Sequence, residues 1–180
     1  MEIQAAILRE AGGQFAIETA TLDAPKTGEV LVKVVAAGVC HTDIGVQHIM
    51  PMPVVLGHEG SGIVEEVGPG VTKVAPGDPV VMTFGSCGRC PSCVEGAPSH
   101  CHDMRTLQFS GARFDGSPTM SQQGEKVNAA FFQQSSFATY ALATERNVVK
   151  ITQGDVPLEL LGPLGCGIQT GAGAVMNTIK

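Results

Sequence analysis

Residues 84–102 read FGSCGRCPSCVEGAPSHCH and contain four of the chain's six cysteines, Cys87, Cys90, Cys93 and Cys101. Two residues separate Cys87 from Cys90 and Cys90 from Cys93, so a turning backbone can aim these thiols at one point, and a fourth thiol after seven more residues completes a tetrahedron. The spacing predicts a structural zinc lobe over about residues 84–102. Four thiolates leave no open coordination position, so we expect this zinc to stabilise the fold and to take no part in chemistry.

Two other interpretations of this stretch stay open. Bacterial ferredoxins begin with the same two C-x2-C steps, which makes an iron–sulfur cluster an alternative, although their fourth thiol comes sooner and precedes a proline. Here Cys101 precedes His102. His100 and His102 flank Cys101 and are alternative zinc ligands.

Composition limits the class of protein. The chain has 180 residues, of which 43% are hydrophobic and 16% charged, as in a soluble globular domain without a membrane-spanning run. The net charge of -6 offers no general attraction for nucleic acid or anionic lipid, so neither is an expected partner. The first ten residues, MEIQAAILRE, lack the pattern of a signal peptide, so we expect a cytoplasmic protein. Metal ligation or reactive thiols are then favoured over disulfides for the six cysteines.

The remaining pattern predicts a mainly β fold with short helices. There are 23 glycines and 11 prolines, which punctuate short segments rich in Val, Ile and Thr, as in barrel-like β proteins. Pro69-Gly70 and Pro76-Gly77 fit tight turns between neighbouring strands. The expected strands are residues 4–9, 15–21, 29–37, 60–67, 79–83, 137–143 and 148–150.

Other segments carry weaker signals. The strand at 29–37 does not alternate cleanly, which predicts burial on both faces. Residues 41–49 fit a short helix. Residues 103–136 are polar, show no sustained period and predict a long loop. Asp155 fits the cap of a helix whose apolar face is 158–164, and a further helix is expected over about 167–179.

Cys40, Cys166 and His58 form a possible second metal site. Both cysteines lie outside the four-cysteine cluster, and all three residues lie in glycine-bounded stretches. No spacing rule connects positions so far apart, and buried cysteine often serves as a small hydrophobe, which remains the alternative.

Several motifs in order resemble the zinc-dependent medium-chain alcohol dehydrogenases. These are GVCHTD at 38–43, GHEGSGIVEEVG at 57–68, PGDPV at 76–80 and the four-cysteine spacing. The stretch GPLGCGIQTGAGA at 162–174 is most similar to aryl or benzyl alcohol dehydrogenases. The resemblance covers nearly the whole chain, and it implies a GroES-like, partly open β-barrel with a zinc-binding lobe, with residues 1–180 forming the catalytic domain.

The resemblance also implies a catalytic zinc held by Cys40, His58 and Cys166. Three protein ligands leave a fourth position open for an alcohol. Together with the structural zinc, this gives two Zn2+ per chain. The implied reaction oxidises a primary, aromatic alcohol to its aldehyde with NAD or NADP.

Neighbouring residues gain roles from the same resemblance. Thr42 is expected to take the alcohol proton, and Asp43 to orient the metal-binding histidine. Glu59 would lie beside the zinc as an alternative ligand, and His41 would meet the cofactor pyrophosphate. Helix capping is the alternative for Thr42 and Asp43. The alternatives are a solvated charge for Glu59 and an exposed polar residue for His41.

The sequence departs from the family at two points. Gly45 stands where many members have a histidine that passes the proton to solvent, so the end of the proton relay is not assigned. His48 is a possible substitute, but a surface histidine is the simpler interpretation, and Phe131 with Phe132 most simply packs a loop.

The second departure is the absence of any glycine-rich fingerprint for a dinucleotide. The Rossmann nucleotide-binding domain is therefore missing from this chain. We expect the chain to be the amino-terminal domain of a longer, homo-oligomeric enzyme and to be inactive alone. The alternative is a stand-alone zinc-binding interaction module on a GroES-like scaffold.

Overall fold

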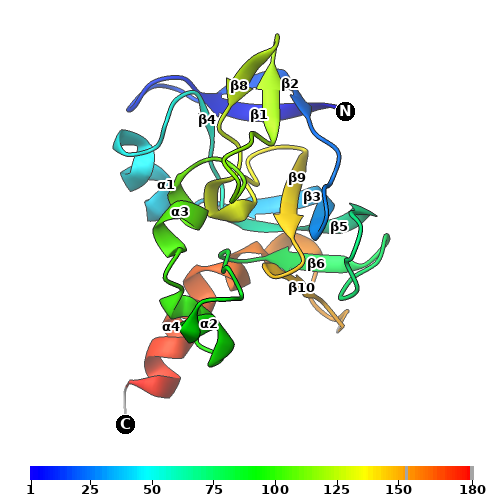
Figure 1. Cartoon of the computed structure of the whole chain (residues 1–180), viewed down its shortest axis with the longest axis vertical. Coiled ribbons are helices and arrows are strands. Elements are labelled where there is room, and N and C mark those ends of the chain that lie inside the picture. Colours follow the sequence, from blue (N-terminus) through cyan, green and yellow to red (C-terminus); the bar gives the residue numbers. More distant parts are fainter. Residues whose placement is uncertain (153, 179–180) are drawn as a thin grey trace.

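The strands form two five-stranded, curled sheets (Figure 1). A computed structural model describes residues 1–152 and 154–178 of the chain. One sheet has the order β4-β1-β2-β7-β8 and the other β10-β6-β5-β3-β9. The strands are β1 Glu2–Leu8, β2 Ala16–Leu22, β3 Glu29–Gly38, β4 Val54–Val55, β5 Glu59–Val67, β6 Pro79–Met82, β7 Met120–Gln122, β8 Glu125–Val127, β9 Tyr140–Thr144 and β10 Val148–Lys150. All seven expected strands are present, and the prediction of a mainly β fold with short helices is confirmed.

The two sheets approach each other where β1 runs beside the segment that leads into β9. The amide of Ala6 donates to the carbonyl of Phe137 over 2.8 Å, and Ala5 bridges to Ala138. The inward side chains of both sheets form the core there, including Ile3, Leu22, Leu31, Val55 and Leu142. Burial of this apolar surface, rather than the short helices, holds the barrel together.

β3 lies at the centre of its sheet, between β5 and β9. The prediction that it is buried on both faces holds only for residues 29–32 and is wrong for the rest, where Lys33 and Val35 are exposed. In that half, exposed residues alternate with partly buried ones, so one face of the strand is open to solvent.

The connection from β5 to β6 contains the two expected tight turns. Gly70 and Gly77 have φ angles of 82° and 92°, which side chains other than glycine disfavour. β5 and β6 then pair antiparallel, with Ser61 opposite Val81.

The helices are short and lie at the edges of the barrel. They comprise α1 His41–Gly45, α2 Pro91–Val94, α3 Met104–Phe109 and α4 Gly167–Asn177, with 3-10 turns η1 Val46–His48, η2 Pro98–His100, η3 Phe131–Gln133, η4 Leu158–Leu160 and η5 Gly162–Gly165. The expected helix at 41–49 is present as α1 and η1. α4 confirms the last predicted helix up to Asn177, whereas its expected end at Ile179 lies outside the described residues. No helix among the described residues is long and apolar enough to cross a membrane.

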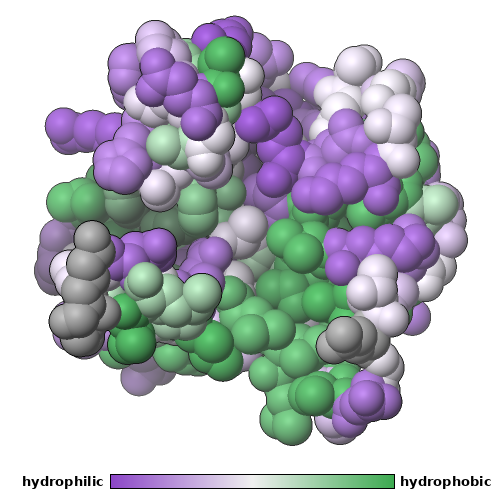
Figure 2. All heavy atoms as spheres, turned by 90° about the horizontal axis from the view of Figure 1, so that it is seen from below, coloured by the Kyte–Doolittle hydropathy of each residue, from purple (hydrophilic) through white to green (hydrophobic). Residues whose placement is uncertain are grey.

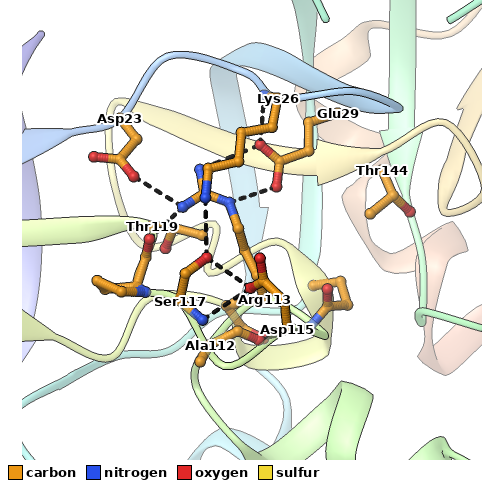
Figure 3. Close-up of polar contacts among 12 residues, drawn as sticks. Asp23, Lys26, Glu29, Ala112, Arg113, Asp115, Ser117, Thr119 and Thr144 are labelled. Carbon is orange, nitrogen blue, oxygen red and sulfur yellow. Dashed lines mark hydrogen bonds and ion pairs between the residues drawn. The ribbon is translucent and has the colours of Figure 1, made fainter. Parts of the chain in front are cut away.

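The segment 103–136 is not the loop that its composition predicted. It contains α3, the hairpin of β7 and β8, and η3. Figure 3 shows how Arg113, only 6% exposed, fastens this segment to the barrel. Its Nε donates to Glu29 Oε1 over 2.7 Å, and its Nη1 donates to Asp23 Oδ2 over 2.8 Å. Buried polar contacts order this segment. Such contacts produce no hydrophobic periodicity in the sequence, so the sequence did not reveal that the segment is ordered.

The prediction of one helix after Asp155, with its apolar face at 158–164, is also wrong. Residues 158–160 and 162–165 form two separate 3-10 turns. Pro163 has no backbone N–H to donate, so a continuous α-helix would lose a hydrogen bond there.

Candidate metal centres

The first candidate centre, called the cluster lobe below, comprises residues 84–102. The Sγ atoms of Cys87, Cys90, Cys93 and Cys101 all lie within 4.8 Å of one another. Backbone amides point at these sulfurs: Cys87 N lies 3.3 Å from Cys101 Sγ, and Cys90 N lies 3.4 Å from Cys87 Sγ. Hydrogen bonds, first of all from the amide of His102, lower the pKa of Cys90 to about 6. The four predicted thiols are therefore gathered in one place, and none of them forms a disulfide.

Little apolar packing supports this lobe. Its hydrophobic cluster consists of Cys90, Cys101 and Leu107, with Cys87, Cys93 and Met104 packed around them. The two flanking histidines lie outside the four-sulfur group: His100 contacts Ser99 and His102 contacts Ser92. Because its core is so small, we expect the order of this lobe to depend on a bound ion.

The second candidate centre, called the barrel site below, comprises Cys40, His58, Glu59 and Cys166. One ligand atom from each lies within 4.8 Å of the others. Cys40 follows β3, His58 and Glu59 stand at the start of β5, and Cys166 lies between η5 and α4. Pairing of β3 with β5, which sets Gly38 opposite Glu59, brings the first two stretches together. The structure thus joins three positions that no sequence spacing connected.

The chemistry of the barrel site fits a metal ion. His58 is 1% exposed, and its Nδ1 lies 3.0 Å from Asp43 Oδ1. Its Nε2 is buried without a hydrogen-bond partner in the described part of the chain, and buried polar atoms are rarely left so. An imidazole nitrogen, two thiols and a carboxylate are ligands that zinc prefers.

The surroundings of the barrel site shift the pKa values of its two thiols in opposite directions. Burial alone would raise the pKa of Cys40, but hydrogen bonds from the backbone and side chain of Thr42, with the positive charge of the nearby His58, outweigh it and lower that pKa. Burial, with the nearby negative charges of Cys40 and Glu59, raises the pKa of Cys166 to about 12. Burial would lower the pKa of His58, yet the carboxylate of Asp43 raises it. Two thiols and a carboxylate gathered in one place need a cation to be ionised together.

The other predicted residues lie around the same site. The Thr42 hydroxyl is 3.6 Å from Cys40 Sγ. Asp43 accepts from the amides of Cys40 and Gly57 as well as holding His58, so it combines a capping contact with an orienting one. Glu59 is 5% exposed and accepts from the amide of Gly167 over 3.2 Å, which excludes the solvated-charge alternative.

Two further positions match the simpler expectations. His41 and His48 are exposed on α1 and η1, and Gly45 has open space where a Cβ would stand. Neither histidine belongs to the groups of candidate metal ligands found among the described residues.

Sequence reasoning missed the contribution of residues 132–134. Gln134 is fully buried; its Nε2 donates to the carbonyls of His58 and Thr83, and its Oε1 accepts from the amide of Gly60. It therefore ties the start of β5 to the end of β6. The ring of Phe132 lies on the imidazole of His58, so it does more than pack a loop. The FFQQ run carries no period that would have marked these roles.

A cavity of about 220 Å³ adjoins Cys166. Apolar and aromatic side chains dominate its walls, namely Phe84, Met104, Phe109 and Phe132. Thr170 and Gln169 of α4 also line it. A small apolar molecule placed here would lie beside the barrel site.

Comparison with known proteins agrees with this architecture. The family described as "Alcohol dehydrogenase GroES-like domain" matches residues 26–153. The chain therefore belongs to the GroES-like domain family of the medium-chain zinc alcohol dehydrogenases, and both thiol centres are candidate zinc sites typical of it.

Within that family, the chain is close to geraniol and benzyl alcohol dehydrogenases. It is 52% identical over 179 residues to a geraniol dehydrogenase of Castellaniella defragrans, covering 98% of this chain and 48% of that protein. It matches the crystal structure of benzyl alcohol dehydrogenase from Acinetobacter calcoaceticus with a TM-score of 0.92 and 49% identity, covering 100% of this chain and 49% of that one. An alcohol dehydrogenase zinc-binding domain protein of Burkholderia ambifaria gives a TM-score of 0.95 and 52% identity, covering 98% and 49%. The chain thus spans about half the length of these relatives.

Proposed function

We propose that residues 1–180 form the catalytic domain of a zinc-dependent alcohol dehydrogenase that oxidises a primary, aromatic or similarly apolar alcohol to its aldehyde. The observation that carries the proposal is the barrel site. A buried histidine nitrogen without a partner converges with two thiols beside an apolar cavity. The names of two relatives, a geraniol and a benzyl alcohol dehydrogenase, agree with a cavity of this character.

In this proposal, Cys40, His58 and Cys166 hold the catalytic metal, with Glu59 as an alternative ligand. When bound there, zinc supplies the Lewis acidity that lowers the pKa of an alcohol toward neutrality. Asp43 fixes the tautomer of His58 by accepting from Nδ1, which leaves Nε2 free to bind. Thr42, whose hydroxyl lies 3.6 Å from Cys40 Sγ, is placed to accept the alcohol proton at Oγ1.

The walls of the cavity have their own part in the proposal. Phe84, Phe109 and Phe132 exclude water and offer flat apolar surfaces to a ring or an alkene. Cys87, Cys90, Cys93 and Cys101 hold a structural zinc and take no part in the chemistry.

Hydride transfer needs an acceptor held close to the alcohol carbon. We propose that NAD or NADP fills this role, bound by a Rossmann domain beyond the present chain and contacted by His41. Figure 2 shows apolar side chains gathered on the underside of the molecule, and α4, which projects there in Figure 1, has no buried residue in its described part. Its exposed Ile168, Val175 and Met176 suit coverage by such a domain.

The further features of the proposal concern assembly and location. We propose a homo-oligomeric parent enzyme. We also propose a cytoplasmic location, because thiols that serve as metal ligands suit a reducing compartment.

The test uses the protein encoded by the whole coding sequence and, separately, the 180-residue chain. We expect NAD- or NADP-dependent oxidation of benzyl alcohol or geraniol by the former, lost in His58→Ala. We expect two zinc ions per chain but no appreciable turnover for the latter. Robust cofactor reduction by the 180-residue chain would contradict the need for a second domain. A coding sequence that ends at Lys180, with two zinc ions bound and no activity, would identify an interaction module instead.

A further inference from the structure

Three groups restrain the imidazole of His58. Asp43 holds Nδ1 at one edge. The ring of Phe132 is stacked on its face, with ring centroids 4.6 Å apart and planes inclined by 29°. Phe131 meets it edge-on, at 5.4 Å and 87°. A single hydrogen bond to Nδ1 leaves the ring free to tilt about that contact, and a ring lying flat against the imidazole removes this freedom.

The backbone that carries Phe132 is held in an unfavourable conformation. Phe132 has φ 51° and ψ 27°, and Gln133 and Ser135 have φ angles of 56° and 48°. Side chains other than glycine, and bulky ones above all, disfavour this left-handed region. A run of three such residues within four positions persists only where surrounding contacts enforce it.

Buried hydrogen bonds enforce that conformation from several directions. Gln133 Nε2 donates to the carbonyl of Leu107 over 2.9 Å, and Ser135 Oγ donates to the carbonyl of Val55 over 2.7 Å. Asn147 Nδ2 donates to the carbonyl of Gln133 over 3.1 Å. The segment is thus clamped to α3, β4 and the turn before β10, and the position of Phe132 is fixed by groups outside its own turn.

Core packing alone does not account for Phe132. Its neighbour Phe131 is fully buried and fills the core beside Leu56 and Val46, and Phe132 packs only against the outside of this cluster. Phe132 stays partly exposed, with one part of its ring on His58 and another in the wall of the cavity beside Cys166. A strained position occupied by a large ring that faces a cavity points to a role at the site.

We propose that Phe132 is a positioning residue: its ring fixes the plane of the His58 imidazole and so keeps Nε2 aimed at the metal. The inference rests on the proposed metal at the barrel site, and it goes beyond the proposed function because it concerns how firmly the ligand is held. Removing the ring therefore leaves the ligand set intact but frees the imidazole to rotate away, which speeds metal loss.

The experiment compares Phe132→Leu with Phe109→Leu in the 180-residue chain loaded with zinc. Phe109 is the matched control because it belongs to the same aromatic group, 5.7 Å from Phe132, and lines the same cavity. Within the described residues it makes no ring contact with His58. Release of zinc to a chromogenic chelator is followed over time, and the phase that belongs to the barrel site is identified as the one missing in His58→Ala.

We expect Phe132→Leu to release zinc from the barrel site about two- to tenfold faster, as expected for the loss of one aromatic pair, while Phe109→Leu changes the rate by less than about twofold. With cobalt(II) at the barrel site, the visible d–d bands should shift in Phe132→Leu alone, since they report ligand geometry. Equal effects of the two variants, or no effect of Phe132→Leu, would overturn the proposal.

A second variant separates the ring from the backbone. Asparagine tolerates the left-handed conformation, so Phe132→Asn removes the ring without forcing the turn to move. We expect faster zinc release at a temperature well below the unfolding midpoint of the variant, where its fold is intact. A normal release rate in Phe132→Asn would show that the ring does not position His58. Because no alcohol or NAD enters these measurements, this result is independent of whether the enzyme proves to be an alcohol dehydrogenase.

Discussion

The cluster lobe and the barrel site contain the same kind of ligand but are built in different ways. All four sulfurs of the cluster lobe come from one stretch of fifteen residues, Cys87 to Cys101. The barrel site draws Cys40, His58 and Cys166 from three distant parts of the chain. The first can be recognised from spacing, whereas the second exists only once β3 and β5 have paired and η5 has docked on them.

The two centres also differ in what holds them before any ion binds. The cluster lobe has a core that consists largely of its own cysteines. The barrel site lies on a sheet whose residues are held by buried hydrogen bonds, including those of Asp43 and Gln134. We therefore expect the cluster lobe to need its ion in order to fold, and the barrel site to be formed before its ion binds.

The largest expected effect is the loss of the lobe's metal in Cys90→Ser. Structural zinc contributes ~10 kcal/mol or more to the folding of small metal sites, and the lobe has little else to order it. We expect one zinc per chain instead of two, and rapid limited proteolysis within residues 84–102.

His58→Ala is the matched variant at the other centre. It should also remove one zinc but leave residues 84–102 resistant to the protease, because the barrel does not depend on the ion. Release of both ions by His58→Ala would show that the two centres are not independent and would break the comparison.

The next effect concerns the scaffold of the barrel site. Gln134→Met keeps the approximate size of the side chain but removes three buried hydrogen bonds, to His58, Gly60 and Thr83. We expect a loss of about 3 kcal/mol in the free energy of unfolding, measured by urea denaturation. Gln14→Met, at an exposed position, is the control and should have no measurable effect. A Gln134→Met chain as stable as the parent would mean that the scaffold is held by other contacts.

The difference between local and long-range construction also decides which features could be predicted from the sequence. Strands with clear turns on either side were predicted, as was the cluster lobe, because each signal is local. The ordering of residues 103–136 was not, because it depends on single buried polar groups such as Arg113 and Gln133, whose partners lie far along the chain. The ligand set of the barrel site came from a family resemblance, since no local pattern relates Cys40 to Cys166.

A graded effect is expected at Asp43. In Asp43→Asn, a neutral amide replaces the carboxylate that accepts the hydrogen bond from His58 Nδ1. The imidazole is then a weaker and less firmly oriented ligand. We expect the affinity of the barrel site for zinc to fall about 10- to 100-fold in chelator competition, while the affinity of the cluster lobe is unchanged. An equal loss at both centres would point to general unfolding instead.

Glycines at the two centres should respond in opposite ways to alanine. Gly88, in the cluster lobe, has a φ of 72°, and an added Cβ would stand 2.5 Å from the guanidinium of Arg146. Because alanine disfavours this conformation, Gly88→Ala should destabilise the zinc-loaded chain by roughly 1–2 kcal/mol. Thermal unfolding of the loaded chain measures the change, and an unaltered midpoint would show that the lobe can adjust.

The smallest effect is expected at Gly45, beside the barrel site. This residue ends α1 with φ -70° and ψ -29°, ordinary helical values, and nothing lies within 4 Å of an added Cβ. Alanine loses less backbone entropy on folding than glycine, so Gly45→Ala should raise the free energy of unfolding by roughly 0.4–1 kcal/mol. Urea denaturation with and without zinc should give the same gain, because the barrel around α1 is formed before the ion binds. A gain seen only in the zinc-loaded chain would mean instead that this edge of the barrel, like the cluster lobe, is ordered by its metal.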